Sequence, residues 1–137
     1  MSTEENKKIV WRYQEIYNSN NLDALNEVVS NDLLTPKIMP GIPTGIEGAK
    51  AAHQIMLAGF PDYQTVIDDL FAEGDKVAAR ITMSGTHTGS FMGIPPTGKH
   101  ISFTGMYIAR IIDGKIVEHW GEEDGVSLLQ QLGVLSI

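Results

Sequence analysis

The chain is 137 residues long, a size at which a single domain can bury its own core. Seventeen acidic residues against ten basic ones give a formal net charge of −7, so we expect neither nucleic acid nor an anionic membrane surface as a partner. The absence of cysteine excludes disulfides, thiolate nucleophiles and cysteine-bound metals. The polar, acidic N-terminus has no apolar signal region and no stretch is long enough to span a membrane. We therefore expect one cytoplasmic domain covering residues 1–137.

Helical patterns dominate the first 60 residues. A helix beginning near Thr3 is predicted by apolar side chains on one stripe, namely Ile9, Tyr13, Ile16 and Tyr17. A short second helix over residues 22–29 follows a turn at 18–21. Residues 31–45 are rich in proline and glycine and predict a loop, with a short strand considered around residues 37–39. A third helix is predicted over 46–59, with His53 on a solvent-facing side.

From residue 63 the period of the apolar side chains changes from helical to two, which predicts strands. The expected strands are 63–73, 77–88, 100–112 and 115–120, with Gly121 ending the last one. Asp68 and Asp69 suggest a bulge in the first of them. His87 falls on the apolar face of the second strand, either as a hydrogen-bonded core histidine or as a polar group in a ligand cavity.

The strand at 100–112 is apolar on both faces. Phe103 and Tyr107 lie on one face, and Met106 and Ile108 lie on the other. Such a sheet is expected to carry helices on one face and a second copy of the chain on the other, as a homodimer or homotetramer. Helices followed by a meander of strands and a last short helix predict an α+β fold, with the helices on one face of an antiparallel sheet.

Asp124 lies between the last predicted strand and a short predicted helix, and two interpretations of its role remain open. As an N-cap it would accept hydrogen bonds from the first N–H groups of the helix, which favours the carboxylate. As a general acid/base in an apolar pocket it would favour the neutral acid. Its neighbours Glu122 and Glu123 are interpreted as solvated loop charges. The four histidines lack metal-ligand spacing, so no metal is expected.

The end of the chain resembles SnoaL-like polyketide cyclases of the nuclear transport factor 2-like superfamily. The pattern is Arg-x-x-Asp-Gly-Lys-Ile-x-Glu-x-Trp-x-x-x-Asp-x-x-x-Leu-x-x-Gln-Leu-Gly, from Arg110 to Gly133, and His-x-Gly-x-Phe-x-Gly-Ile-Pro-Pro-Thr-Gly-Lys from His87 is a second family pattern. The resemblance implies a cone-shaped α+β barrel in which a curved antiparallel sheet carries helices packed on its concave face. One departure is Leu34-Thr35-Pro36, where many relatives place a histidine.

The resemblance also implies an activity, which is cofactor-free intramolecular aldol ring closure of a polyketide-type ester with Asp124 as general acid/base. The ligand would be small and hydrophobic or polycyclic, and the candidate pocket walls are Tyr17, Phe60, Met83, Tyr107 and Trp120. His87 and His119 could orient or polarise a carbonyl, although strand parity puts His119 and Trp120 on opposite faces, so at most one of these two points inward and the sequence does not decide which. The alternatives are a non-catalytic small-ligand binding domain and a ketosteroid-isomerase-like proton-transfer enzyme acting on a smaller substrate.

Overall fold

A computed structural model describes residues 1–36 and 40–136, so the short strand considered around residues 37–39 lies outside the described residues. The helices are α1 (Thr3–Asn18), the 3₁₀ helix η1 (Leu22–Glu27), α2 (Gly45–Gly59) and α3 (Gly125–Gln131). The strands are β1 (Val29–Leu34), β2 (Gln64–Glu73), β3 (Lys76–Thr86), β4 (His100–Ile112) and β5 (Lys115–Glu123). Among the described residues, no helix is both long and apolar enough to cross a membrane.

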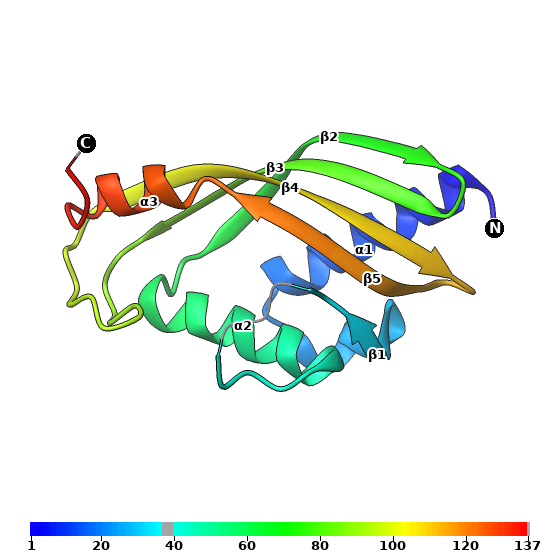
Figure 1. Ribbon diagram of the computed structural model, residues 1–137, viewed down its shortest axis with the longest axis horizontal. Coiled ribbons are helices and arrows are strands. Elements are labelled where there is room, and N and C mark those ends of the chain that lie inside the picture. Colours follow the sequence, from blue (N-terminus) through cyan, green and yellow to red (C-terminus); the bar gives the residue numbers. More distant parts are fainter. Residues whose placement is uncertain (37–39, 137) are drawn as a thin grey trace.

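The five strands form one curved sheet in the order β1-β5-β4-β3-β2 (Figure 1). β2 to β5 form the expected antiparallel meander, whereas β1 pairs in parallel with β5, so the sheet is mixed. The predicted second helix is therefore shorter than expected: η1 ends at Glu27 and Val29 begins β1. Adjacent β-branched valines favour the pleated strand over a helix, which explains the difference.

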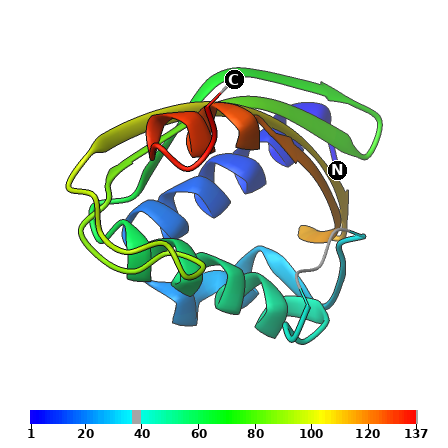
Figure 2. The ribbon, with the colours of Figure 1, turned by 60° about the vertical axis from the view of Figure 1, so that its left-hand side comes forward.

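α1 begins in a capping box, in which the Ser2 side chain accepts from the N–H of Glu5 and the Glu5 side chain accepts from the N–H of Ser2. At its other end, Asn18 fastens the helix to the edge strand β2: its Nδ2 donates to the Thr65 carbonyl at 2.8 Å and its Oδ1 accepts from the Thr65 N–H at 3.0 Å. α1 therefore lies on the concave side of the sheet, between the sheet and α2 (Figure 2).

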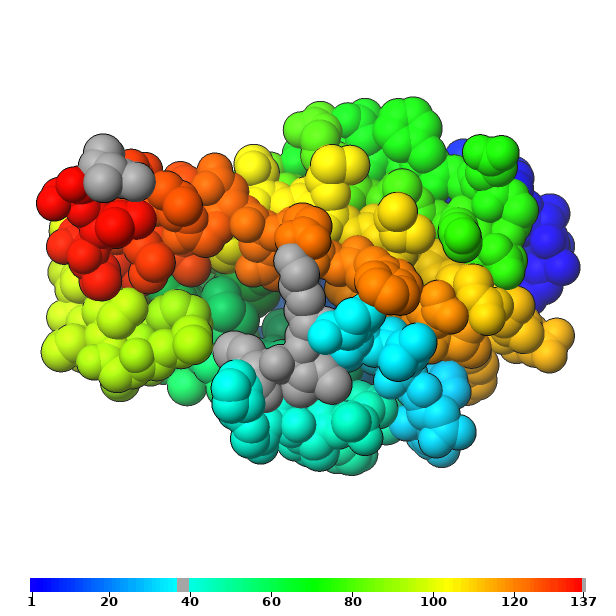
Figure 3. All heavy atoms as spheres, viewed as in Figure 1, coloured from blue at the N-terminus to red at the C-terminus, as the bar shows by residue number. Residues whose placement is uncertain are grey.

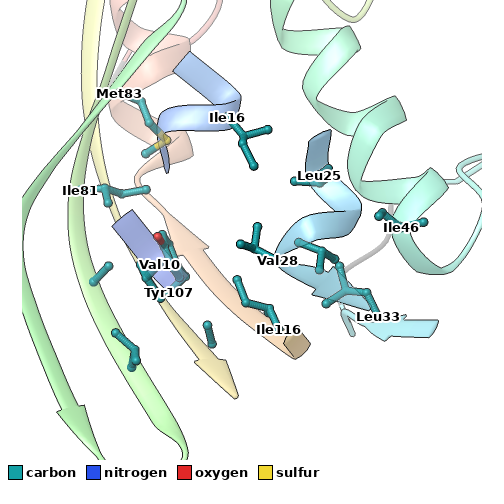
Figure 4. Packing of buried hydrophobic residues seen from close by; sticks show 14 of the residues in the cluster. Val10, Ile16, Leu25, Val28, Leu33, Ile46, Ile81, Met83, Tyr107 and Ile116 are labelled. Carbon is teal, nitrogen blue, oxygen red and sulfur yellow. The ribbon is translucent and has the colours of Figure 1, made fainter. Parts of the chain in front are cut away.

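The hydrophobic core fills the space between the concave face of the sheet and the helices (Figure 4). β4 alternates buried and exposed side chains along its whole length, with Phe103 and Tyr107 inward and Met106 and Ile108 outward. The expected α+β architecture, with helices on the concave face of a curved sheet, is confirmed.

Two details of the strands bear on the site. The bulge predicted at Asp68 and Asp69 is confirmed by a register shift between Ile67 and Asp69. The prediction that Gly121 ends the last strand is wrong, because β5 continues to Glu123 and pairs Gly121 with Tyr107. The residues that follow Trp120 therefore lie on a strand, where side chains alternate between the two faces, rather than in a loop.

Candidate active site

Strand pairing decides which side chains of β5 face the concave side of the sheet. His119 pairs with Ala109, Gly121 with Tyr107 and Glu123 with Gly105, and these three β4 partners are buried. Directly opposed residues of an antiparallel pair point to the same face. His119, Gly121 and Glu123 therefore face inward, while Trp120 pairs with Ile108 on the convex face.

Aromatic and imidazole rings gather on this concave side. His119 stacks on Tyr107 with ring centroids 4.7 Å apart and an interplanar angle of 28°. Tyr17 lies edge-on to Tyr13 at 4.7 Å and contacts the ring of His53 at 4.6 Å. The expectation that His53 faces solvent is wrong: the residue is 7% exposed, and its Nε2 lies 3.2 Å from the Asn20 side-chain oxygen. The curvature of the sheet brings α1 and α2 over the same surface, so their rings meet.

Burial keeps these groups uncharged near neutral pH. It lowers the pKa of His119 to about 4 and raises the pKa of Tyr17 and of Tyr63 to about 12. It also raises the pKa of Tyr107, whose buried hydroxyl has no hydrogen-bond partner among the residues that the structure describes. The concave side therefore offers neutral hydrogen-bonding groups in apolar surroundings, which suits the carbonyl and hydroxyl oxygens of an uncharged ligand.

Glu123 lies on the concave side of the sheet at the end of β5, and not in a loop as the sequence analysis expected. Its Cγ and the Cε of Met83 both lie over Gly105, at 3.3 Å and 2.9 Å from the position that a Cβ there would occupy. The residue is accessible to solvent at the end of β5, yet enough protein surrounds its carboxyl that burial raises the pKa. If β5 had been expected to continue past Gly121, the alternation of side chains along the strand would have placed Glu123 on the same face as His119.

Asp124 is placed as the N-cap of α3. Its carboxylate accepts from the Ser127 N–H at 3.0 Å, and the residue is exposed. The cap interpretation of this residue is thus realised in the fold. A role of Asp124 in proton transfer stays a separate hypothesis, because it concerns contact with a ligand.

Replacing Asp124 with alanine is expected to lower the free energy of unfolding by about 1 kcal/mol, because the first turn of α3 loses its cap. Asparagine caps as well as aspartate does, so Asp124→Asn should keep nearly the full stability. Urea unfolding followed by circular dichroism measures both differences. Equal losses in the two variants would contradict the capping role.

Phe60 and His87 lie deeper than an accessible pocket wall, since both are fully buried. Their rings contact each other at a centroid distance of 5.2 Å. The Thr97 N–H donates to Nδ1 of His87 at 3.2 Å, and the His87 N–H donates to the Lys99 carbonyl at 2.9 Å. Here His87 holds the base of the loop at residues 88–98, which fits the interpretation as a hydrogen-bonded core histidine.

The predicted pocket residues therefore separate into three groups. Tyr17, Met83, Tyr107 and His119 come together on the concave side, and Phe60 with His87 lies beneath the loop. Trp120 lies on the convex face instead, where the residue is 49% exposed and its indole N–H donates to the Glu118 carboxylate at 3.2 Å. Within residues 1–36 and 40–136, no three histidine, aspartate or glutamate side chains are grouped so as to hold a metal ion.

The space-filling view shows a recess that leads toward the concave side (Figure 3). It lies between the loop at 88–98, drawn in yellow-green, and the orange-to-red segment in which β5 passes into α3, with atoms of α2 visible deeper inside. The orange end of β5 borders this recess.

Comparison with known proteins identifies the family of this fold and site. The sequence profile of the family "SnoaL-like polyketide cyclase" matches residues 7–132. The chain belongs to the SnoaL-like polyketide cyclase family, and its fold is that of the nuclear transport factor 2-like proteins.

Characterised relatives and a solved structure cover nearly the whole chain. The aklanonic acid methyl ester cyclase DauD of Streptomyces sp. (strain C5) is 30% identical over 91% of this chain and 80% of its own. The nogalonic acid methyl ester cyclase of Streptomyces nogalater is 30% identical over 85% of this chain and 89% of its own. The structure of TsrD from Streptomyces laurentii matches with a TM-score of 0.89 and 32% identity, over 98% of this chain and 99% of that one.

Proposed function

We propose that this protein catalyses a cofactor-free, intramolecular aldol ring closure of a polyketide-type methyl ester. The observation that carries the proposal is the concave surface itself, which carries neutral phenol and imidazole groups and, at the end of β5, a carboxyl group whose pKa is raised by burial. Similarity to two methyl ester cyclases indicates the class of substrate.

For this reaction the protein needs only to position the substrate and to transfer a proton. A carbon between two carbonyl groups loses a proton to a carboxylate, and the resulting enolate attacks a carbonyl carbon of the same molecule. The new alkoxide then takes the proton back, so no atom is lost. Holding the chain in a folded conformation supplies much of the rate, because intramolecular attack depends on orientation.

The neutral His119 imidazole can donate a hydrogen bond to a carbonyl oxygen on which negative charge develops. A neutral imidazole donates without surrendering its proton outright. The ring of Tyr17, which is only partly buried, would supply an apolar contact for a flat ring system. Gly121 has no side chain, and the ring of His119 lies over it, with its Cε1 at 3.5 Å from the position that a Cβ there would occupy.

The direct test is turnover of aklanonic acid methyl ester and of nogalonic acid methyl ester, followed by absorbance and by liquid chromatography with mass detection. Ring closure gives a product of unchanged mass and changed retention. Formation of that product faster than in a heat-denatured control supports the proposal. An unchanged substrate with both esters contradicts it.

A second candidate is a non-catalytic domain that binds ligands of the same class. The specific observation in its favour is Asp124, which the family resemblance suggests as acid/base and which here is exposed and occupied as a helix cap. Quenching of tyrosine fluorescence by a polycyclic ester, with no change in the ester after prolonged incubation, would identify the binding domain.

We further propose that two copies associate through the convex face of the sheet. One cross-strand row on this face is apolar from β2 to β5 and consists of Phe71, Ala78, Ile108 and Trp120. Phe71, Ile108 and Trp120 are each 45–66% exposed in the single chain. A shallow hollow of about 380 Å³ adjoins this row beside Met106. A contiguous exposed apolar row suits a two-fold contact, since the same patch serves both partners.

Replacing Ile108 with lysine is expected to weaken this association at least about 100-fold, because each copy would bring a charge into an apolar contact. Size-exclusion chromatography with light scattering over a dilution series measures the change. Trp11→Lys, on an exposed face of α1, is the control and should leave the mass unchanged. A monomeric wild-type protein at high concentration would contradict the proposal.

A further inference from the structure

The side chain of Gln131 fastens the last turn of α3 to the beginning of β4. Its amide oxygen accepts from the Ser102 N–H at 2.9 Å, and its amide nitrogen donates to the Ser102 carbonyl oxygen at 2.7 Å. One side chain thus binds both backbone groups of a strand residue, as a residue of a neighbouring strand would. Because hydrogen bonds are directional, Gln131 fixes the orientation of α3 on β4 as well as its distance.

This edge of β4 is available because β5 leaves it. The ladder between β4 and β5 ends at the pair Gly105 and Glu123. The next bond along the edge is made by the Asp124 N–H, which donates to the Thr104 carbonyl oxygen at 2.9 Å. Asp124 and Gln131 therefore attach the two ends of α3 to the same edge of one strand.

Ser127 connects the two attachments. Its N–H donates to Oδ1 of Asp124 at 3.0 Å, and its hydroxyl accepts from the amide nitrogen of Gln131 at 2.9 Å. Residues 124, 127 and 131 are three and four positions apart, so their side chains lie along one side of the helix. Hydrogen bonds thus run from the backbone of β4, through Gln131 and Ser127, to the carboxylate of Asp124.

α3 needs such a fixed point because it is short. It has seven residues, and a helix of that length is not stable on its own in water. The buried side chains of Leu128 and Leu132 hold it against the core. Apolar contacts are non-directional, so they do not set the rotation of the helix about its axis. The hydrogen bonds of Gln131 set that rotation, and with it the direction of the Asp124 carboxylate.

Resting on the function proposed above, with Asp124 as the acid/base that the family resemblance implies, we propose that Gln131 is a positioning residue for the proton transfer. Asp124 lies between β5 and α3, in the segment that borders the recess (Figure 3). Ser127 holds Oδ1 of the carboxylate, whereas Oδ2 forms no hydrogen bond within the part of the chain that the structure describes. Oδ2 is therefore the oxygen free to exchange a proton with the ligand. A displacement of about 1 Å at such a group can lower the rate about 100-fold.

The first test follows proton abstraction alone, which does not require ring closure. A β-keto methyl ester that cannot cyclise is incubated with the protein in D₂O, and ¹H NMR measures the loss of its α-proton signal. Gln131→Leu should lower kcat for this exchange about 10–100-fold and leave KM within about threefold of wild type. The control is Val10→Ala, a core substitution in α1 that also lowers stability and should leave kcat within about threefold. Equal losses of kcat in the two variants would overturn the proposal.

Gln131→Glu tests the hydrogen bonds themselves. A protonated glutamic acid side chain has nearly the same shape, and it can still accept from the Ser102 N–H and donate to the Ser102 carbonyl oxygen. The ionised side chain cannot donate. The ratio of its exchange rate to that of wild type should therefore rise as the pH falls from about 7 to about 5, toward the ordinary range of a glutamate. A ratio that does not change with pH would contradict the positioning role.

The hold on the carboxylate is also measured without a substrate. ¹H–¹⁵N NMR follows hydrogen exchange of the Ser127 amide, which donates to Asp124. Protection of this amide should fall about 10-fold or more in Gln131→Leu and stay near the wild-type level in Val10→Ala, because the opening is local to α3. Unchanged protection in Gln131→Leu would reject the proposal.

Asp124→Asn separates this inference from the proposed function. Exchange that is lost in Asp124→Asn but keeps its wild-type rate in Gln131→Leu would reject the role of Gln131 and leave the function in place. Exchange that depends on both residues, with no ring closure of either methyl ester, would sustain Gln131 as a positioning residue and reject the cyclisation. Exchange that survives in Asp124→Asn, or that is absent from the wild type, would reject proton transfer by Asp124 and with it the role of Gln131.

Discussion

Replacing Phe60 with alanine is expected to lower the free energy of unfolding by about 3–5 kcal/mol, the cost usually found when a buried aromatic ring is deleted. Phe60 is fully buried, and its ring lies 5.2 Å from the rings of both His87 and Phe91. The ring therefore fills the space between the end of α2 and the loop at 88–98. A protein of this size has a total stability of about 5–15 kcal/mol, so the variant should be partly unfolded well below the wild-type melting temperature.

Urea unfolding followed by far-UV circular dichroism measures this effect. The matched control is Trp11→Ala, which removes a larger ring from a half-exposed position on α1 and should cost about 1 kcal/mol or less. Because Phe60 supports His87 and the loop beside the recess, limited proteolysis should also cut Phe60→Ala within residues 88–98 first. Similar losses in the two variants would show that the packing around Phe60 is not what stabilises this end of the molecule.

Acidification from pH 7 to pH 4.5 is expected to destabilise the wild-type protein, with His119 as a principal cause. Burial lowers the pKa of His119 to about 4 in the folded protein, whereas an unfolded histidine titrates near about 6.5. Below that value the unfolded chain binds a proton that the folded protein does not, so stability falls as the pH falls. The full difference corresponds to at most about 3 kcal/mol, complete only near pH 4. His53, whose pKa is also lowered by burial, acts in the same direction.

His119→Phe isolates this contribution, because phenylalanine can keep the stacking on Tyr107 and has no proton to gain. The variant should show a clearly smaller loss of unfolding free energy between pH 7 and pH 4.5 than the wild type. Trp11→Phe, at a half-exposed position on α1 and without a proton to gain, is the control and should keep the wild-type dependence. An unchanged pH dependence in His119→Phe would contradict the burial of a neutral imidazole.

Much of the fold could be predicted because it depends on local patterns. The period-two alternation from residue 77 onward predicted the faces of the strands, and the Asp113-Gly114 turn joins β4 to β5 in the gap between the expected strands 100–112 and 115–120. Both residues of that turn have positive φ, as a tight hairpin requires. The short α3 and its Asp124 cap could likewise be predicted from the neighbouring residues.

Elements that depend on distant partners were harder to predict. The strand β1 exists because Val29 pairs with Ile116, a residue far along the chain, so a helical pattern over residues 22–29 was misleading. Histidine is a polar residue, so the sequence alone predicts that His53 faces solvent. In the fold, α1 approaches α2 and buries His53 beside Tyr17. No local pattern reports which helices will meet.

By itself, the sequence determined the class of fold, the family pattern and the alternation that separates His119 from Trp120. These features depend on the spacing of side chains along one strand or helix, and that spacing does not depend on how the elements pack together. Only the tertiary structure decided which face of β5 is concave, and with it that His119 points inward and Trp120 outward. It also decided that β5 runs on to Glu123, because the ladder to Gly105 and Tyr107 extends the strand past a glycine that would end it in isolation. Glu123 therefore lies on the concave face and Glu122 on the convex face, since one step along a strand reverses the face of a side chain.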